Sequence, residues 1–212
     1  MQQPWRWQNA DVGISPRQFE QMKERVNGKT RHIPSAAGAS TTLMPRRHNV
    51  ILGVDPSLRG TGFGVIRLAA PFPAVLAQGT ISCPRHWARS RCLAAIFRDL
   101  TTAMERYRPT VCAMEGLFFA QNLKTAIVMG EARGAALASV AGFGVEVFEI
   151  APRRLKQAMV GYGAAQKTAV GAMVQRMLNL PEPPAPDAAD ALALALAYAH
   201  EAAGRFGPPG KI

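Results

Sequence analysis

The chain has 212 residues, 48% of them hydrophobic, which suits one folded domain with a proper core, alone or with an appendage. Its net charge of +11 and pI of about 10.4 favour nucleic acid as a partner. The three cysteines lack metal-ligand spacing, and no apolar run reaches the roughly 18 residues of a membrane span. We therefore expect a cytoplasmic protein with no disulfide framework, no signal peptide and no membrane partner.

Residues 1–48 differ from the rest and are strongly basic, with eight Lys and Arg against three Asp and Glu. A helix is predicted at 15–26, where Ser15 caps it and Pro16 takes the first helical position. Small polar residues at 34–42 predict a flexible linker. This basic N-terminal extension has two interpretations: a DNA-contacting arm, or an over-extended reading frame whose true start is Met44.

From residue 49 the pattern predicts three strands and then an alternation of helices and strands. The first strand, 49–55, leads into a Gly-rich turn at 56–60, and the next two strands, 62–69 and 74–82, are close enough to pair antiparallel. Further strands are predicted at 110–115 and 146–150. The predicted helices span 87–108, 122–141, 152–160, 165–178 and 187–203. This order predicts an α/β domain over 49–203, with a mixed five-stranded sheet flanked by helices, and a short tail at 204–212.

The final helix has a competing interpretation, because alanine and leucine alternate over 191–197 as they would in a strand. We predict a helix, since the segment is long, lacks β-branched residues and is rich in alanine. On that helix Asp187 and Asp190 share one face in the first turn, where the helix dipole favours negative charge.

Four carboxylates stand where acids are uncommon. Asp55 and Glu115 each end an apolar strand, and Asp187 and Asp190 open the last helix. Acids brought within about 4 Å of each other repel by about 4 kcal/mol per pair at an effective dielectric of 20, so such a cluster needs protons or cations. Hard oxygen ligands select Mg²⁺ or Mn²⁺, and a pair of such ions suits phosphodiester hydrolysis. Taken singly, each acid is better explained as a turn or capping residue; taken together they predict an acidic metal site.

Several motifs occur in the order found in one family. These are ILGVDPSLRGTGFGVI at 51–66, AMEGLFFAQN at 113–122, ARG at 132–134, KQ at 156–157, GYGAAQK at 161–167 and PDAADALA at 186–193. In this order they resemble the RuvC-type Holliday junction resolvases, over about residues 49–200. Ser57 and Gly116 depart from the family's usual Gly and Gln, and residues 1–48 have no counterpart in it.

The resemblance implies a ribonuclease H-like fold and a homodimer that resolves four-way DNA junctions by paired symmetric nicks during recombination and repair. It implies two Mg²⁺ ions, with Mn²⁺ as an alternative, and a branch-migration complex of the RuvA and RuvB type as partner. The implied roles fall on the following residues: Asp55, Glu115, Asp187 and Asp190 as catalytic metal ligands, Lys156 and Lys167 as basic residues near the scissile phosphate, and Phe118 as a probe of the opened junction.

Other residues are assigned by their own chemistry. Phe119 neighbours Phe118, and adjacent aromatics in a loop suit stacking on unpaired bases, although packing beneath the loop explains Phe119 equally well. Arg153 and Arg154 are predicted phosphate contacts. In the helix at 122–141, Gly130 and Gly134 allow close helix approach, which suits either a dimer seam or packing on the chain's own sheet.

Two rival functions share this fold. A catalytically inactive junction-binding protein is compatible with the departures at Ser57 and Gly116, but all four acids are present. A kinase or ATPase of the actin and sugar-kinase type would need a second lobe and a second phosphate loop, for which this chain is too short.

Overall fold

One mixed sheet organises the residues that the computed structural model describes, namely 48–116, 122–202 and 210–212. The chain divides after Pro45, and the sheet with its helices belongs to the second part, Arg46–Ile212. The helix predicted at 15–26 and the linker predicted at 34–42 lie outside the described residues.

The sheet has the strand order β3-β2-β1-β4-β5-β6. Strands β1, β2 and β3 form an antiparallel meander, β4 and β5 run parallel to β1, and β6 pairs antiparallel with β5. Their bounds are Val50–Asp55, Gly60–Arg67, Ala74–Ser82, Val111–Glu115, Glu146–Ile150 and Gly210–Lys211. The mixed α/β fold is confirmed, but the prediction of five strands is wrong by one. Strand β6 has only two residues and no hydrophobic pattern, so pairing with β5 alone makes it a strand.

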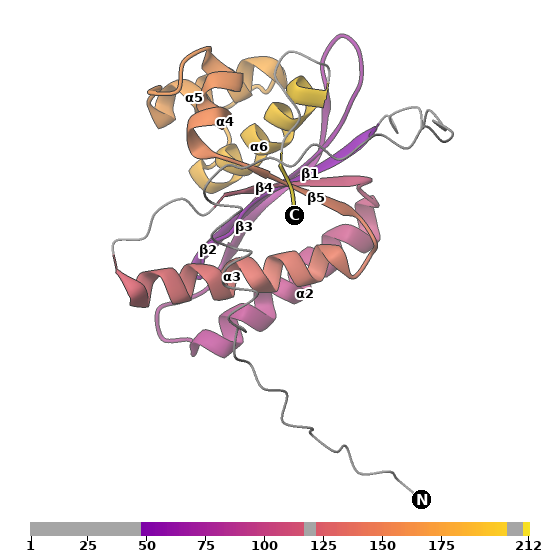
Figure 1. Ribbon diagram of the computed structural model, residues 1–212. Helices are drawn as coiled ribbons and strands as arrows, with labels where there is room; N and C mark the ends of the chain where they lie inside the picture. The colour runs from indigo at the N-terminus through magenta and orange to yellow at the C-terminus, as the bar shows by residue number, and fades with distance from the viewer. Residues whose placement is uncertain (1–47, 117–121, 203–209) are drawn as a thin grey trace, which may run out of the picture. The chain divides into compact units, whose positions relative to one another are not determined.

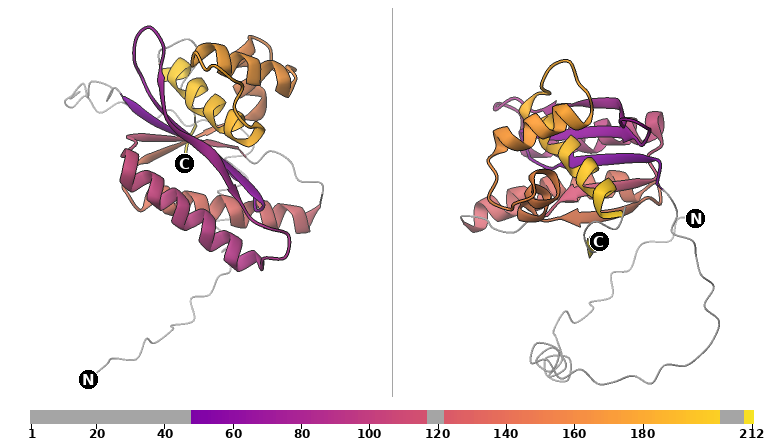
Figure 2. Two further views of the ribbon diagram at one scale, coloured as in Figure 1. Left: turned by 180° about the vertical axis from the view of Figure 1, so that it is seen from behind. Right: turned by 90° about the horizontal axis from the view of Figure 1, so that it is seen from above.

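Helices cover both faces of the sheet. The first group is α2 (Arg89–Tyr107) and α3 (Leu123–Ala141), and the second is α4 (Pro152–Val160), α5 (Lys167–Met177) and α6 (Pro186–Ala202). Figure 1 shows the two groups on opposite sides of the strands, and Figure 2 shows the same arrangement from two further directions. Each group buries its own apolar core against the sheet.

Side-chain alternation along β1 decides what each face of the sheet presents. Leu52 and Val54 point into the core under α2 and α3, while Ile51 belongs to the core under α6. Since successive side chains of a strand point to opposite faces, Asp55 points toward the α6 side, as Ile51 does.

Helix α6 confirms the helical interpretation of the alternating Ala and Leu run. Every residue from Ala191 to Tyr198 is buried, because α6 packs on β1 and β2 on one side and on α4 and α5 on the other. A helix buried all round is apolar all round, so its sequence shows no single apolar stripe.

Glycines let α6 approach the sheet closely. A Cβ on Gly53 would lie 1.9 Å from the Ala191 carbonyl oxygen, and one on Gly62 would lie 2.1 Å from the Asp187 carbonyl oxygen. A Cβ on Gly64 would lie 2.7 Å from the Leu192 side chain. We call these three residues the glycine groove. It seats the first half of α6 directly on the backbone of β1 and β2.

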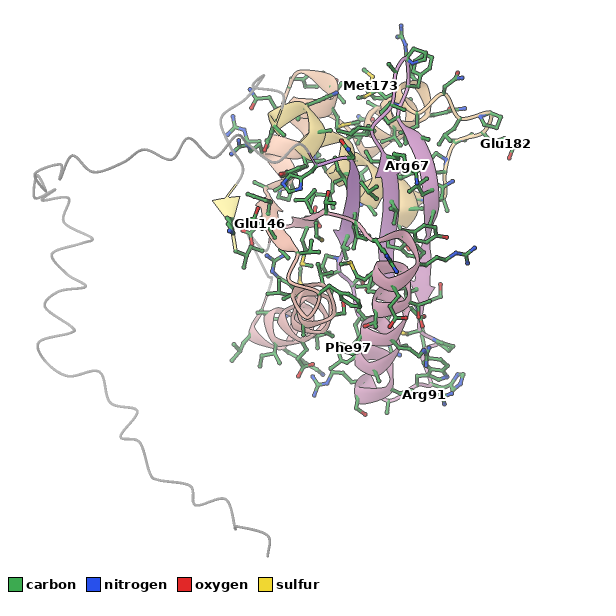
Figure 3. The ribbon with its side chains drawn as sticks, turned by 90° about the vertical axis from the view of Figure 1, so that its right-hand side faces the viewer. Arg67, Arg91, Phe97, Glu146, Met173 and Glu182 are labelled. Carbon is green, nitrogen blue, oxygen red and sulfur yellow. The ribbon has the colours of Figure 1, made fainter. Side chains whose placement is uncertain are left out.

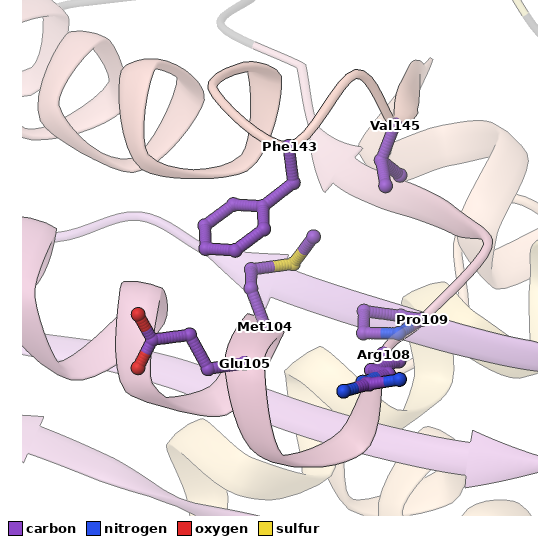
Figure 4. A pocket seen from close by; sticks show the side chains of 6 residues that line it. All are labelled: Met104, Glu105, Arg108, Pro109, Phe143 and Val145. Carbon is purple, nitrogen blue, oxygen red and sulfur yellow. The ribbon is translucent and has the colours of Figure 1, made fainter.

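A hollow of about 350 Å³ lies at the other end of the sheet, where α2 ends and β4 begins (Figure 4). The side chains that line it are Met104, Glu105, Arg108, Pro109, Phe143 and Val145. It is therefore separate from the strand ends that carry Asp55 and Glu115. Within the described ranges, no helix combines the length and apolar character needed to cross a membrane.

The glycine groove predicts a position-specific cost of an added methyl group. Gly62→Ala should lower the free energy of unfolding by about 1–3 kcal/mol, because strand and helix must separate to admit the Cβ. Gly171→Ala in α5 is the matched control, since its Cβ would meet nothing within 4 Å, and it should be neutral or stabilising by about 0.5–1 kcal/mol. Urea unfolding measures both; equal losses would show that α6 does not depend on the groove.

Candidate functional site

Asp55 and Glu115 lie side by side at the carboxyl edge of the sheet. Strands β1 and β4 are parallel, with Val54 opposite Met114, so the next residue of each strand is the acid. Both carboxyl groups point to the α6 side, and they are hydrogen-bonded to each other. The expectation that two strand ends place their acids together is met by this geometry.

Helix α6 adds the other two acids to this edge. The Asp187 Oδ2 atom lies 3.0 Å from the point where a Cβ on Gly60 would stand, beside the turn that follows Asp55. Asp190 follows one turn later, and the charges of both aspartates act on Asp55. The glycine groove thus has a consequence for the site, because it brings the first turn of α6 down to the ends of β1 and β4.

The strand-end carboxyl groups are held in an environment that disfavours their charges. Burial, followed by the hydrogen bond to Asp55 and the neighbouring negative charges, raises the pKa of Glu115 to about 8. Burial also raises the pKa of Asp55, with Asp190 and Asp187 adding to the effect. With no cation present, the raised pKa values favour one proton shared between the two carboxyl groups.

Lys167 is the basic side chain that contacts the cluster. It begins α5, and its ammonium group donates to the Asp190 Oδ2 atom at 2.8 Å. That hydrogen bond, and then the charges of the acids, raise the pKa of Lys167 against the opposing effect of burial. The lysine thus keeps its positive charge beside Asp190, on the solvent-exposed side of the four acids, and 82% of its side chain is exposed.

The remaining predicted residues lie apart from this cluster. Lys156 is half-buried in α4 and, within the described ranges, makes no ion pair with the acids. Arg154 pairs with the buried carboxylate of Glu201 near the end of α6, while the exposed Arg153 lies across Gly163. Phe118 and Phe119 lie outside the described residues.

The turn after Asp55 is closed by a residue that sequence reasoning did not select. The buried Thr61 hydroxyl donates to the Ser57 carbonyl at 2.6 Å and accepts from the Ser57 amide at 3.2 Å. Ser57 is not among the described residues with positive φ, so serine in place of the family's glycine bears no backbone strain there.

Arg133 is a second residue whose contacts the sequence did not reveal. Its guanidinium, with a side chain only 12% exposed, donates to the backbone carbonyl of Glu115 and to the carboxylate of Glu149 in β5. The Gly116 amide donates to the Ile150 carbonyl at 3.0 Å. The peptide group that follows Glu115 is thus held from both sides. The ARG motif at 132–134 was the available signal, but spacing alone did not say what the arginine contacts.

The donor chemistry of the site fits a hard divalent cation. Its candidate ligand atoms are carboxylate oxygens, which suit Mg²⁺ and Mn²⁺, and the pKa of Glu115 is raised first by burial and then by the neighbouring acids. In the described part of the chain no three acids already converge on one point, since Asp55 and Glu115 bond to each other and Asp190 bonds to Lys167. Binding a cation would replace the proton shared by Asp55 and Glu115.

Comparison with known proteins gives a consistent result. The family model for crossover junction endodeoxyribonuclease RuvC matches residues 51–198. The RuvC of Alkaliphilus oremlandii is 43% identical over 152 residues, covering 71% of this chain and 93% of the relative. That of Heliobacterium modesticaldum is 44% identical over 152 residues, covering 71% and 94%.

A solved structure agrees with these relatives. T. thermophilus RuvC in complex with a Holliday junction substrate superposes with a TM-score of 0.72 at 32% identity, covering 78% of this chain and all of that one. The matched segment contains all four acids, both strand ends and the first half of α6. The chain therefore belongs to the RuvC family of crossover junction endodeoxyribonucleases.

Proposed function

We infer that this chain is a metal-dependent endonuclease that resolves four-way DNA junctions. The observation that carries this inference is the meeting of Asp55, Glu115 and the first turn of α6 at one edge of the sheet. The similar protein from T. thermophilus was solved with a Holliday junction substrate, which supports the same substrate for this chain. Residues 49–203 form the nuclease domain in this proposal, and 1–48 are a basic extension to it.

The four acids would hold the cations, two Mg²⁺ ions or alternatively Mn²⁺. Divalent cations bound there supply positive charge at the phosphate and lower the pKa of water. Asp55 and Glu115 would hold a cation as carboxylates without their shared proton, and α6, seated in the glycine groove, would place Asp187 and Asp190 beside them. Arg133 keeps the backbone of Glu115 from turning away.

Basic and aromatic residues would bind the junction around this edge. Lys167, held by Asp190, presents a charged ammonium group to a phosphate beside the acids. Lys156, Arg153 and Arg154 are phosphate contacts further along α4, with Arg154 shared between DNA and Glu201. Phe118 and Phe119 would stack on bases of the opened junction.

Helix α3 supports a homodimer. None of its residues before Ala132 is buried, and Leu123 and Ile127 are 77% and 48% exposed. Added Cβ atoms on Gly130 and Gly134 would meet nothing within 4 Å, so the side of α3 that these glycines occupy is not packed on the chain's own sheet. A two-fold pairing through α3 would give two acidic sites for two opposed cuts. A branch-migration complex of the RuvA and RuvB type completes the proposed set of partners.

The inactive junction-binding alternative finds no support in the turn. Ser57 adopts an unstrained backbone, and the acids before and after it in the chain keep their positions at the edge.

The shared proton predicts an unusual pH dependence of stability in the metal-free protein. Folded Glu115 keeps its proton up to a pKa of about 8, whereas the ordinary value of 4.5 applies when unfolded. Between these values the native state binds more protons, so the free energy of unfolding should fall as pH rises from about 5 to about 8. Urea unfolding in a chelator should show a shallower fall for Glu115→Gln.

The same experiment tests metal binding without reference to cleavage. Adding Mg²⁺ or Mn²⁺ should stabilise the wild type most near the upper end of that pH range, where the cation no longer competes with the proton. Identical pH slopes for the wild type and Glu115→Gln would contradict the shared-proton assignment.

Removing one carboxylate charge should separate binding from cutting. With Mg²⁺ and a labelled mobile four-way junction, the wild type should make paired nicks in opposing strands and leave linear duplex intact. Asp55→Asn should abolish nicking, a loss of at least about a thousandfold, because a ligand oxygen becomes an amide, while junction affinity is retained. Cutting by Asp55→Asn would refute its role. Tight binding without nicks by the wild type, in Mg²⁺ and in Mn²⁺, would favour the inactive alternative.

A charge on the exposed side of α3 should break the dimer. Light scattering should give the wild type twice the 22.8 kDa chain mass, and Ile127→Glu should give a monomer whose nicks are no longer paired. Phe72→Glu is the matched control, because Phe72 is 47% exposed in the connection between β2 and β3. Dimers in both variants would exclude α3 as the seam.

A further inference from the structure

A basic segment precedes α2 and has no role in the acidic site. Residues 84–91 contain three arginines, one histidine and one tryptophan but no acid, and we call them the pre-α2 segment. Arg85 and Arg91 are exposed. Within the described ranges, neither of these two arginines forms an ion pair, whereas Arg89 pairs with Glu131 of α3 at 3.2 Å.

The pre-α2 segment begins at the same edge of the sheet as the acids. Strand β3 ends at Ser82, which pairs with Gly60, and Gly62 pairs with Asp55. Trp87 of the segment and Leu58 of the turn that follows Asp55 pack against the same cluster, which consists of Cys83, Cys92 and Ala95. The segment thus borders that turn on the α2 side of the sheet, whereas Lys167 borders the acids on the opposite, α6 side.

Arg59 ties the pre-α2 segment to the turn after Asp55. Its guanidinium donates to the Pro84 carbonyl at 2.6 Å, to the Trp87 carbonyl at 3.2 Å and to the Cys92 sulfur at 3.2 Å. Its own carbonyl accepts from the Cys83 amide at 3.0 Å, and the Trp87 amide closes a turn onto Pro84 at 3.0 Å. These hydrogen bonds hold the segment in one shape, connected to the strand that carries Asp55.

Arg91 is itself held in place. Its guanidinium carbon lies 3.9 Å from the centre of the Trp87 ring, a stacking geometry that leaves the edges of the planar group open to donate to phosphate oxygens. Figure 3 shows Arg91 at the lower end of the molecule and Arg67 well away from it, in the upper part. Positive charge that is pre-ordered and unpaired costs little entropy when it meets a phosphate.

We propose that the pre-α2 segment is a second phosphate-binding surface, on which Arg85 and Arg91 hold the backbone of a junction arm beside the cleavage edge. This proposal rests on the proposed function, because the junction arm in question contains the strand that is cut. A strand that crosses the acidic edge has phosphates on both sides of it, so Lys167 contacts one side and the pre-α2 segment the other. Arg59 is a positioning residue that fixes this surface relative to Asp55.

The salt dependence of junction binding tests the proposal. Each phosphate contact contributes about 0.9 to the slope of log affinity against log salt concentration, so Arg85→Gln/Arg91→Gln should reduce the slope by about 1.8. The measurement uses the full chain carrying Asp55→Asn and a fluorescent four-way junction. Arg85→Lys/Arg91→Lys should retain the wild-type slope, because lysine also neutralises phosphate.

The matched control removes the same amount of positive charge at the opposite end of the sheet from Asp55. Arg67→Gln/Arg106→Gln changes two exposed arginines, and Arg106 lies 5.4 Å over Tyr107 much as Arg91 lies over Trp87. Its slope should equal that of the parent. Equal slopes for the two Gln pairs would overturn the proposal. The proposed function fails on a different result, namely no junction cleavage by the wild type.

Discussion

The close approach of α6 to β1 and β2 is the constraint on which the rest of the site depends. Acids at the ends of two neighbouring parallel strands meet by topology, but acids on a helix meet them only if the helix lies unusually near the sheet. The glycine groove removes the side chains that would otherwise keep it away, to the point where one added Cβ would lie within 2.1 Å of the Asp187 carbonyl. The glycines of the groove therefore determine both how α6 packs on the sheet and where its two aspartates lie relative to Asp55 and Glu115.

In the proposed enzyme the two faces of the sheet have different roles: one carries the acidic site, and the other carries the proposed dimer and phosphate-binding surfaces. The α6 face carries the carboxyl groups of Asp55 and Glu115, which favour a shared proton, together with Lys167, which pairs with Asp190. The α2 and α3 face carries the exposed apolar turns of α3 and the pre-α2 segment. Arg133 connects the faces, because it rises from α3 to the carbonyl of Glu115. In a dimer formed through α3, Arg133 of each protomer would therefore connect the interface helix directly to the strand end that carries Glu115.

Sequence predicted most of the fold because its patterns are local. Strand alternation and helical periodicity mark element boundaries that the structure has within a few residues, and the structure adds that Asn122 caps α3. The grouping of Asp55 with Glu115 was predictable, since the carboxyl ends of parallel strands share an edge. The glycine groove, Thr61, Arg133 and β6 were not, because each depends on contacts between segments far apart in the chain. Serine at position 57, where the family usually has glycine, does not adopt a positive φ and so bears no backbone strain.

A crystal of the full chain grown with Mn²⁺ would test the central claim most directly, through the anomalous scattering of the metal. The account predicts anomalous peaks bounded by carboxylate oxygens of Asp55 and Glu115 from the strands and of Asp187 or Asp190 from α6, with the Asp55–Glu115 hydrogen bond broken. Manganese bound elsewhere, or held by the strand acids alone with α6 contributing nothing, would contradict the claim that the glycine groove assembles the site.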